Sequence, residues 1–376
     1  MFEHRNYHNF FIPANYLGLS TQNLIMKKLS ALVLSSILFA CSTMNESANL
    51  QKWSLNTEAG FRGISAVSDD ICWFSGAEGQ VYRIESSSNQ IINCSPNACK
   101  ALDFRDIHAF SASKAIILSA GLPAVILLTE DGGQHWQEVY RNEKEGIFFD
   151  ALDFWDVERG IAFGDAIGQA LQIIETKDGG MTWHAIDSTL IPLAHPQQGG
   201  FAASGTALKT YGDGKVIIGL GGKEATVYKS ENYGKTWNRQ FAPIDQGAPS
   251  KGIFSFSFIN EKRILVVGGD YLGDSLSKDC ISISDNGGYS WRVSNESRIS
   301  LKGKYLSNII AIDEQQWFAH SRFGACFTQD AGRTWQSFPF KYYSGSLSQN
   351  YIWLSGPKGS LARISIADLK QKPQTK

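Results

Sequence analysis

The sequence predicts an all-β fold, a β-propeller of seven four-stranded blades, and three observations lead to this prediction. A short pattern occurs five times in one register: a hydroxyl residue, an Asp or Asn two places later, a Gly two further and a Trp three beyond that. A pattern that recurs roughly every 50 residues is typical of radial arrays of small sheets. Short runs of Val, Ile, Phe, Tyr and Trp between Gly, Asp, Asn and Ser fill the intervals and predict strands. The repeats end at Trp136, Trp183, Trp237, Trp291 and Trp335.

Each repeat has the composition of a tight hairpin. An Asp or Asn side chain accepts hydrogen bonds from amides of its own turn, and Gly supplies the positive φ that the turn needs. The Trp then begins the next strand and covers the turn. We therefore expect these residues to staple hairpins and not to form a catalytic set. The motif resembles the Asp box, or bacterial neuraminidase repeat, of sialidases and many propeller proteins.

The strands around each repeat predict the blades in chain order. A first blade without a repeat is expected at 61–67, 71–75, 80–85 and 90–94, and the second begins at Asp103. The third should comprise 148–156, 160–164, 170–176 and 182–186, and the next three begin at Gly200, Gly252 and Tyr305. The last blade, at 344–349, 351–355 and 359–366, lacks an outer strand. Segment 52–57 is expected to pair there and close the ring, so that no long strand edge stays exposed.

The amino-terminal region predicts export and a lipid anchor. Lys27 and Lys28 precede an apolar run of about a dozen residues, the pattern of a secretory signal. The run ends in Leu38-Phe39-Ala40-Cys41, which resembles a lipobox, so Cys41 is the expected lipidation site; the alternative is an ordinary export signal with an incidental Cys. Ser42 favours the outer membrane, and Met26 is the expected start. The predicted organisation is an upstream extension and signal peptide at 1–40, a tether at 41–50, the propeller at 51–366 and a tail at 367–376.

Cysteines and charge narrow the classes of ligand. Cys94 and Cys99 are expected to form a small disulfide loop in an oxidising compartment, whereas Cys72, Cys280 and Cys326 are expected as buried thiols. The sequence has neither metal-ligand spacing nor a cofactor motif. Thirty-five basic and thirty-six acidic residues give a formal charge of −1 without a basic run, which argues against nucleic acid. We expect a monomer that meets the membrane only through its anchor.

Propeller topology predicts where a site would lie. The starts of the innermost strands and the turns between second and third strands should share one mouth of the channel. Two interpretations remain open: the mouth binds carboxylates or acidic peptide segments, or its charges pair across blades and lock the ring. The longer loop at 270–279 is a candidate lid. The candidate binding residues are Arg62, Arg105, Asp106, Asp150, Asp165, Asp270, Tyr271 and Arg322.

Several of these segments resemble a bacterial family of exported propellers that are similar to the photosystem II stability and assembly factor. The resemblance rests on the residues at 61–63, 103–106, 148–156, 163–165, 199–206 and 268–270. It implies a seven-bladed ring and, by analogy with the photosynthetic relatives, non-catalytic binding of a membrane-protein precursor through an arginine-bearing surface. Arg62 and Arg105 are the candidates for that role.

Two enzymatic alternatives remain. Phe61-Arg62-Gly63-Ile64 resembles the Phe/Tyr-Arg-Ile-Pro motif of sialidases but lacks the proline, and Asp150 with Asp165 would be the acid and base of a glycosidase. An oxidoreductase would need a nucleotide-binding motif, and the glycine cluster at 219–222 lacks its spacing. The prediction is therefore a non-catalytic propeller that binds a protein or peptide, as an assembly factor or scaffold.

Overall fold

The computed structural model describes residues 49–191, 193–273, 279–294 and 305–371, and these belong to one unit of the chain, Met44–Lys376. The predicted signal peptide, Cys41 and most of the tether lie outside the described residues. Among the described residues, no helix is long and apolar enough to cross a membrane. The helical elements are a 3-10 turn η1 (Ser188–Leu190) and a short helix α1 (Ile366–Leu369).

Within the described residues, the strands form antiparallel sheets, five of which have four strands each. The first three follow the chain in order: β2 (Phe61–Ala66), β3 (Ile71–Gly76), β4 (Val81–Glu85) and β5 (Gln90–Asn93); β6 (Asp103–Ala109), β7 (Ala115–Ala120), β8 (Ala124–Thr129) and β9 (Gln137–Asn142); β10 (Phe149–Phe154), β11 (Gly160–Ile167), β12 (Ala170–Thr176) and β13 (His184–Ala185). Two more lie near the carboxyl end: β23 (Asn308–Ala311), β24 (Trp317–Ser321), β25 (Gly324–Thr328) and β26 (Gln336–Phe338); and β27 (Ser344–Leu347), β28 (Tyr351–Ser355) and β29 (Ser360–Ser365) with β1 (Leu50–Ser54).

The sixth sheet has nine strands and contains two meanders. One is β15 (Leu208–Tyr211), β16 (Lys215–Gly222), β17 (Thr226–Ser230) and β18 (Asn238–Phe241); the other is β19 (Ala248–Phe258), β20 (Ile264–Asp270), β21 (Ile281–Ser284) and β22 (Arg292–Val293). The ends of β16 and β19 pair at Gly221 with Gly252, and β14 (Gln198–Gly199) also pairs with β16.

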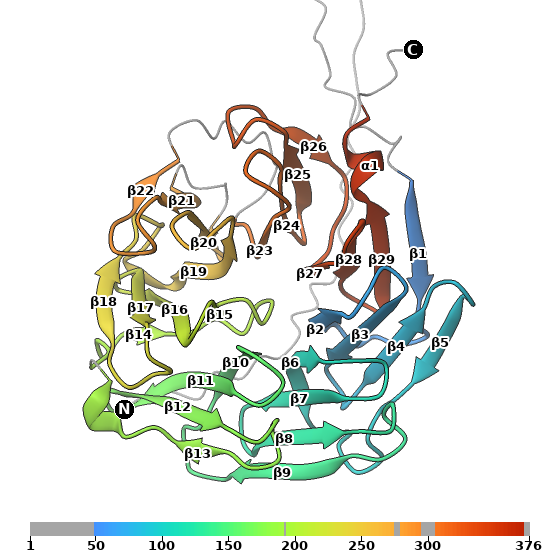
Figure 1. The fold of residues 1–376 in the computed structure, drawn as a ribbon, viewed down its shortest axis with the longest axis horizontal. Coiled ribbons are helices and arrows are strands. Elements are labelled where there is room, and N and C mark those ends of the chain that lie inside the picture. Colours follow the sequence, from blue (N-terminus) through green and yellow to red (C-terminus); the bar gives the residue numbers. More distant parts are fainter. Residues whose placement is uncertain (1–48, 192, 274–278, 295–304, 372–376) are drawn as a thin grey trace, which may run out of the picture. The chain divides into compact units, whose positions relative to one another are not determined.

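The first strands of the meanders form a closed circle of contacts. In chain order β2, β6, β10, β15, β19, β23 and β27 each contact the next, and β27 contacts β2 (Figure 1). The sheets radiate from this circle, and their buried apolar side chains pack sheet against sheet. Trp73, Trp317 and Trp353 are among the largest fully buried side chains. The architecture is a β-propeller.

The two ends of the described chain meet in one sheet, as the sequence predicts. β1 pairs antiparallel with β29, from Leu50 opposite Ile364 to Ser54 opposite Ser360. The strand begins two residues before the predicted 52–57 segment. Trp53 is buried and stacks on Trp353 with ring centroids 5.5 Å apart. An edge strand from one end of the chain therefore completes the last sheet.

The five repeats form near-identical turns between third and fourth strands. In the first, the Thr129 hydroxyl accepts from the Gly133 amide at 2.9 Å, and the Asp131 carboxylate accepts from the His135 amide at 2.9 Å. The same bonds occur around Asp178, Asn232, Asn286 and Asp330. The side chain therefore satisfies amides that the turn leaves unpaired.

The structure corrects the predicted Cys94–Cys99 disulfide, because both residues are free thiols. The Cys94 side chain points into the interior, where its Sγ lies 3.3 Å from the Gly132 carbonyl and under the first repeated turn. The indole N–H of Trp136 donates to the Cys94 carbonyl at 2.7 Å. Cys94 thus packs against the next sheet. Cys72, Cys280 and Cys326 are buried free thiols, as expected.

The fourth blade also differs from the prediction. Its innermost strand was expected from Gly200 but begins at Leu208. Residues 198–207, which we call the crossing segment, contain only the two-residue strand β14 and otherwise run as turns. This segment decides the geometry of the candidate site.

Candidate functional site

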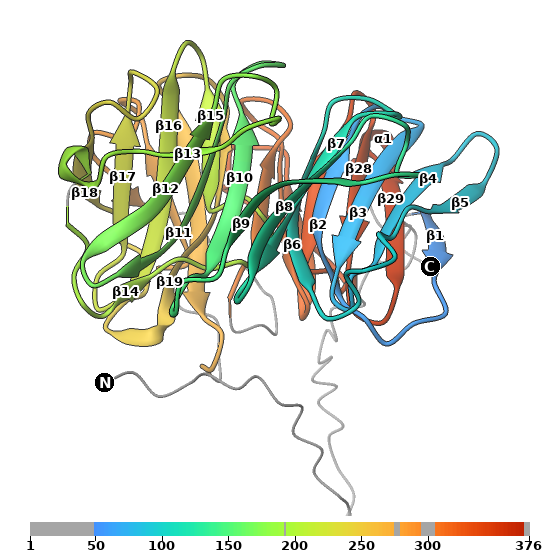
Figure 2. The ribbon, with the colours of Figure 1, turned by 90° about the horizontal axis from the view of Figure 1, so that it is seen from below.

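The propeller has two faces, which differ in the turns that lie on them (Figure 2). The innermost strands start at one face, to which the turns between second and third strands return; we call it the arginine face. The repeated turns and the turns between first and second strands lie on the other, the repeat face. All eight predicted site residues lie toward the arginine face. The sequence-based placement of these residues in one region therefore agrees with the strand directions.

Arg62 and Arg105 occupy equivalent positions on neighbouring strands. In β2 the pairing register shifts between Phe61 and Gly63, and in β6 it shifts between Phe104 and Asp106. Each arginine is thus the extra residue of a β-bulge, a device that re-aims a side chain. In β10 the shift brackets Asp150. Asp150 therefore takes the place in β10 that the arginines take in β2 and β6.

The crossing segment lies on these two arginines. Arg62 donates from Nη1 to the Ala203 carbonyl, and Arg105 donates from Nη1 to the Ala202 carbonyl, both at 3.3 Å. The Arg62 guanidinium also lies 4.5 Å from the centre of the Tyr343 ring. Arg105 pairs with Asp103 at 2.6 Å. No carboxylate among the described residues is within ion-pair distance of Arg62.

Three glycines let the segment lie directly on three carboxyl groups. A Cβ at Gly199 would be 2.8 Å from Asp165, one at Gly200 2.3 Å from Asp150, and one at Gly205 2.1 Å from Asp106. The Gly200 amide donates to Asp165 Oδ1 at 2.8 Å. Asp106 accepts instead from the amides of Ile107 and Leu152, both at 2.8 Å. Only residues without a side chain fit against these carboxyl groups.

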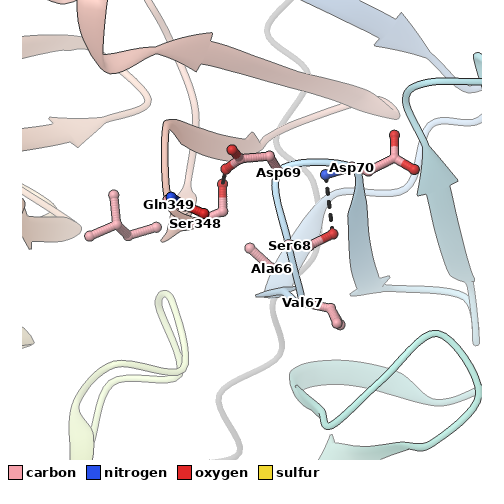
Figure 3. A pocket seen from close by; sticks show the side chains of 8 residues that line it. Ala66, Val67, Ser68, Asp69, Asp70, Ser348 and Gln349 are labelled. Carbon is pink, nitrogen blue, oxygen red and sulfur yellow. Dashed lines mark hydrogen bonds between the residues drawn. The ribbon is translucent and has the colours of Figure 1, made fainter.

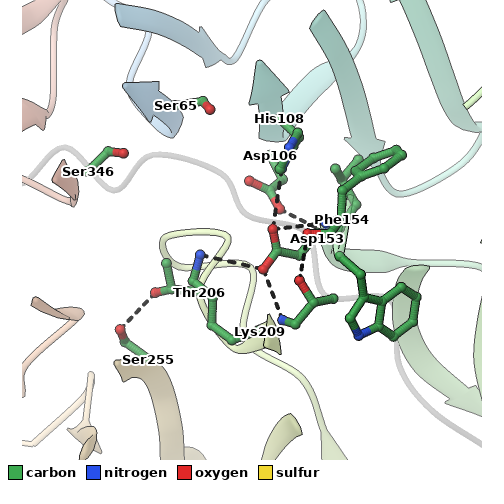
Figure 4. Close-up of polar contacts among 12 residues, drawn as sticks. Ser65, Asp106, His108, Asp153, Phe154, Thr206, Lys209, Ser255 and Ser346 are labelled. Carbon is green, nitrogen blue, oxygen red and sulfur yellow. Dashed lines mark hydrogen bonds and ion pairs between the residues drawn. The ribbon is translucent and has the colours of Figure 1, made fainter. Parts of the chain in front are cut away.

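The far end of the segment reaches strands on the opposite side of the circle. Ser204 donates to the Ser307 carbonyl at 3.0 Å, and Thr206 shares a 2.7 Å hydrogen bond with Ser255 (Figure 4). Asn308 donates to the Thr206 hydroxyl at 3.2 Å. The segment therefore spans the centre of the propeller, from β2, β6 and β10 to β19 and β23.

Burial perturbs the ionisation of the groups beneath the segment. Burial, together with nearby Arg105, lowers the pKa of Arg62. Burial raises the pKa of Asp106 to about 7, although its two amide donors oppose the rise. The pKa of Asp150 is raised well above its usual range by burial and by Asp165, with Arg105 and the Ala202 amide acting in the opposite direction. Neither carboxyl oxygen of Asp150 makes a hydrogen bond of ordinary geometry.

The remaining predicted residues lie toward the same face as the segment. The Tyr271 ring lies 6.2 Å from that of Phe201, so it flanks the segment. The pKa of Asp270 is lowered. Burial alone would raise it, but the hydrogen bonds that Asp270 accepts from Ser250 and from the Leu272 amide outweigh burial. Arg322 is exposed on the turn between β24 and β25. Part of the candidate lid, residues 274–278, lies outside the described residues.

A charged cluster that the sequence did not single out joins β6, β10 and β15 (Figure 4). Asp153 lies 3.3 Å from His108 Nδ1 and 3.7 Å from Lys209 Nζ, and it accepts from the Thr210 amide at 3.0 Å. Burial opposes ionisation of Asp153, yet Lys209, His108 and the Thr210 amide together lower its pKa. Asp153 therefore joins three strands through polar and charged contacts. The sequence had left the same role open as an alternative for the residues of the mouth.

Two cavities in the described part of the chain lie on the repeat face. One, of about 550 Å³, lies between the ends of β2 and β27 and is lined by residues 66–70 and 347–349 (Figure 3). Its Asp69 carboxylate already accepts from Ser348 at 2.7 Å and from Asn350. The other, of about 520 Å³, is lined in part by Trp155, Leu190 and Tyr233. Neither contains a predicted site residue.

Comparison with solved structures confirms the fold. The structure of YCF48 bound to a D1 peptide aligns with a TM-score of 0.59 and 16% identity, over 84% of this chain and 96% of that one. YCF48 from Cyanidioschyzon merolae aligns with a TM-score of 0.59 and 15% identity, over 85% and 99%. The GH74 xyloglucanase from Xanthomonas campestris gives 0.60 and 13%, over 85% of this chain and 54% of that one.

No protein-family model matches the chain, and no curated protein matches it. Identities of 13–16% support the fold and leave the activity to be argued from the site. The chain is a β-propeller whose similar structures include both a peptide-binding protein and a glycoside hydrolase.

Proposed function

We propose that this protein is a non-catalytic, seven-bladed propeller with Asp-box hairpins, which binds a protein or peptide partner on its arginine face. The single observation that carries the proposal is the arginine pair. Arg62 and Arg105 stand side by side on equivalent bulges and hold main-chain carbonyl groups of the crossing segment. A site that holds peptide oxygens of its own chain has the chemistry to hold those of another, and a guanidinium binds carboxylates best.

A carboxylate-bearing segment is the partner class that this charge favours. Two neighbouring guanidinium groups repel each other, and Arg62 lacks a described carboxylate partner. A peptide carboxylate would neutralise that charge. Tyr271, Asp270 and Arg322 are proposed to contact the rest of the ligand, since they lie on or beside turns at the same face. The peptide-bound YCF48 structure supports peptide binding by this fold.

The glycosidase alternative is favoured by the GH74 neighbours and opposed by the geometry. Asp150 is fully buried under Gly200, and Asp165 is occupied by the Gly200 amide. A catalytic acid and base must face a sugar that lies between them, and here the backbone of residues 199–200 occupies that side. We therefore propose structural roles for Asp106, Asp150 and Asp165 in seating the segment.

A peptide array tests the proposal. Each sequence is synthesised with a free and with an amidated carboxyl terminus, and with or without acidic residues. We expect binding that depends on a carboxylate and weakens as salt rises. An array without any carboxylate-dependent binder contradicts it. Hydrolysis of a sialoside or a xyloglucan oligosaccharide, abolished by Asp150→Asn or Asp165→Asn, favours the enzyme instead.

We further propose that the protein is an exported lipoprotein, anchored at Cys41 and facing the periplasm from the outer membrane. The support is the sequence order of two lysines, an apolar run and Leu-Phe-Ala-Cys. We propose that it is monomeric and meets the membrane only through the anchor.

The anchor makes a direct prediction. Cys41→Ala should abolish labelling by a radioactive fatty acid, because the acyl chain has no thiol to occupy, and it should leave an uncleaved or soluble protein. Cys99→Ala, which removes a half-buried thiol of the propeller, should label like the parent. Persistent labelling of the Cys41 variant would place the lipid elsewhere.

A further inference from the structure

The crossing segment covers the arginine pair of the proposed binding site, so a ligand that uses both guanidinium groups must replace its carbonyls. Ala202 and Ala203 supply consecutive carbonyl oxygens to Arg105 and Arg62. The rest of the segment is tied down by hydroxyl and amide contacts at Ser204 and Thr206. The amino-terminal half is held by the pairing of β14 with β16 and by the Gln198 side chain, which donates to Thr226 and to the Glu224 carbonyl. Its glycine backbone also rests on carboxyl groups.

Asp150 is the carboxyl group in the least favourable position. It is fully buried, its oxygens lack hydrogen bonds of ordinary geometry, and the Gly200 backbone lies directly on it. Asp165 is its acidic neighbour on β11, and Arg105 on β6 is the cation that acts on it. The crossing segment contributes no ionisable side chain, since residues 198–207 read Gln-Gly-Gly-Phe-Ala-Ala-Ser-Gly-Thr-Ala. Protonated, Asp150 is compatible with this cover.

Ionisation of Asp150 would change that balance. A buried carboxylate needs water or a donor, and a second carboxylate beside it adds repulsion. Arg105 and the Ala202 amide offer only partial relief, because Arg105 is already shared between Asp103 and the Ala202 carbonyl, and the amide does not reach Asp150 in ordinary hydrogen-bond geometry. The backbone of Gly200 lies directly over Asp150, and that of the adjacent Gly199 lies over Asp165. Lifting that backbone would admit water and, in the same movement, remove the carbonyl groups from the arginines.

We propose that the crossing segment is a proton-dependent latch over the arginine site, closed while Asp150 is protonated and released when Asp150 ionises. The proposal rests on the proposed function for its consequence, since release exposes the guanidinium groups to a carboxylate ligand. The opening itself needs no ligand.

The direction of the pH dependence follows from linkage. A carboxyl whose pKa is higher in the closed state than in water, where it is about 3.9, binds its proton more tightly when the latch is closed. The closed state is therefore fully favoured below the ordinary pKa and loses stability as pH rises toward the raised pKa of Asp150. Asp106 also has a raised pKa, under Gly205. Because the amides of Ile107 and Leu152 donate to Asp106, its carboxyl group has hydrogen-bond partners in either charge state.

Hydrogen exchange of the intact protein tests the latch without a ligand. Protection of peptides covering 198–207 is measured across about pH 4 to 9, a range that includes the raised pKa values of buried carboxyl groups, and is corrected for intrinsic exchange. In the parent we expect protection to fall by at least about tenfold as pH rises, because a tenfold difference in proton affinity between closed and open states changes the opening equilibrium by that factor. Asp150→Asn, which stays neutral, should keep the segment protected throughout. Because Asp106 is intact in that variant, the difference reports Asp150.

Asp178→Asn is the matched control, because this repeat position is Asn in two of the five copies, Asn232 and Asn286. It should behave as the parent. If Asp150→Asn fails to fold, Asp165→Asn carries the test, since its amide oxygen still accepts from Gly200 while the repulsion is gone, and the fall in protection should shrink. Protection that is independent of pH in the parent overturns the latch, as does an undiminished fall in the folded Asp150 variant or, where that variant fails to fold, in the Asp165 variant. A failed latch with carboxylate-dependent peptide binding intact leaves the proposed function standing.

Discussion

Trp53→Ala should lower the free energy of unfolding by about 3–5 kcal/mol, the usual cost of removing a large aromatic side chain from a core. Trp53 is buried, stacks on Trp353 at 5.5 Å and donates to Asn89 at 2.9 Å. It is the residue that fastens β1 to the last sheet. Because β1 and β29 join positions more than 300 residues apart, loosening this strand exposes an edge of β29. We therefore expect both a lower urea midpoint and aggregation on heating.

Lys52→Ala is the control for Trp53→Ala, since Lys52 is on the same strand but exposed. Its unfolding should match the parent within about 0.5 kcal/mol, as for surface substitutions in general. A Trp53→Ala protein that unfolds like the Lys52 variant would mean that β1 contributes nothing to closure.

Replacing Arg62 and Arg105 together with Ala should weaken binding of a carboxylate peptide by roughly 10²–10⁴-fold. Each hydrogen bond to a charged group contributes about 1.5–3 kcal/mol, and each 1.4 kcal/mol is tenfold in affinity. The same change removes two donors from the crossing segment, so we also expect a loss of stability of about 1–3 kcal/mol. Fluorescence anisotropy with one labelled array peptide measures the first effect, and urea unfolding measures the second.

Two further variants separate charge from geometry. Arg141→Ala removes an exposed arginine of β9 that pairs with Glu138 and Glu143, and it should bind as the parent does. Arg62→Lys with Arg105→Lys keeps the charge but loses the planar guanidinium, so its affinity should lie between that of the parent and that of the double Ala variant. A double Ala variant with parental affinity would mean that the arginines only hold the segment.

The repeats could be predicted from sequence because their interactions are local. Thr129, Asp131, Gly133 and His135 hydrogen-bond within one turn, so eight consecutive residues contain the whole motif. The strand at 50–54 was predictable for a different reason. The last blade lacked an outer strand, and an unassigned strand lay at the other end of the chain. Pairing the two explains both, and the pairing of β1 with β29 confirms this prediction.

The details of the site could not be predicted, because they depend on contacts between distant strands. A bulge changes the register by one residue, and nothing local in the sequence shows that Asp150 takes the position of Arg62 and Arg105. The residues at 199–206 read as the start of a strand, since nothing local shows that three glycines will rest on Asp165, Asp150 and Asp106. Cys94 likewise faces a turn of the next sheet, 38 residues away at Gly132. Spacing along the chain suggested its pairing with Cys99 and was wrong.

The central claim is that a partner peptide binds the arginine face, and photo-crosslinking tests it most directly. A peptide from the array that binds in a carboxylate-dependent way carries a photoreactive group next to its carboxylate, and the crosslinked residues are identified by mass spectrometry. The account predicts crosslinks around Arg62 and Arg105, including Tyr343, Phe201 and Tyr271, which are lost in the double Ala variant. Crosslinks on the repeat face, at the cavity of Trp155 and Tyr233 or at that of residues 66–70, would contradict it.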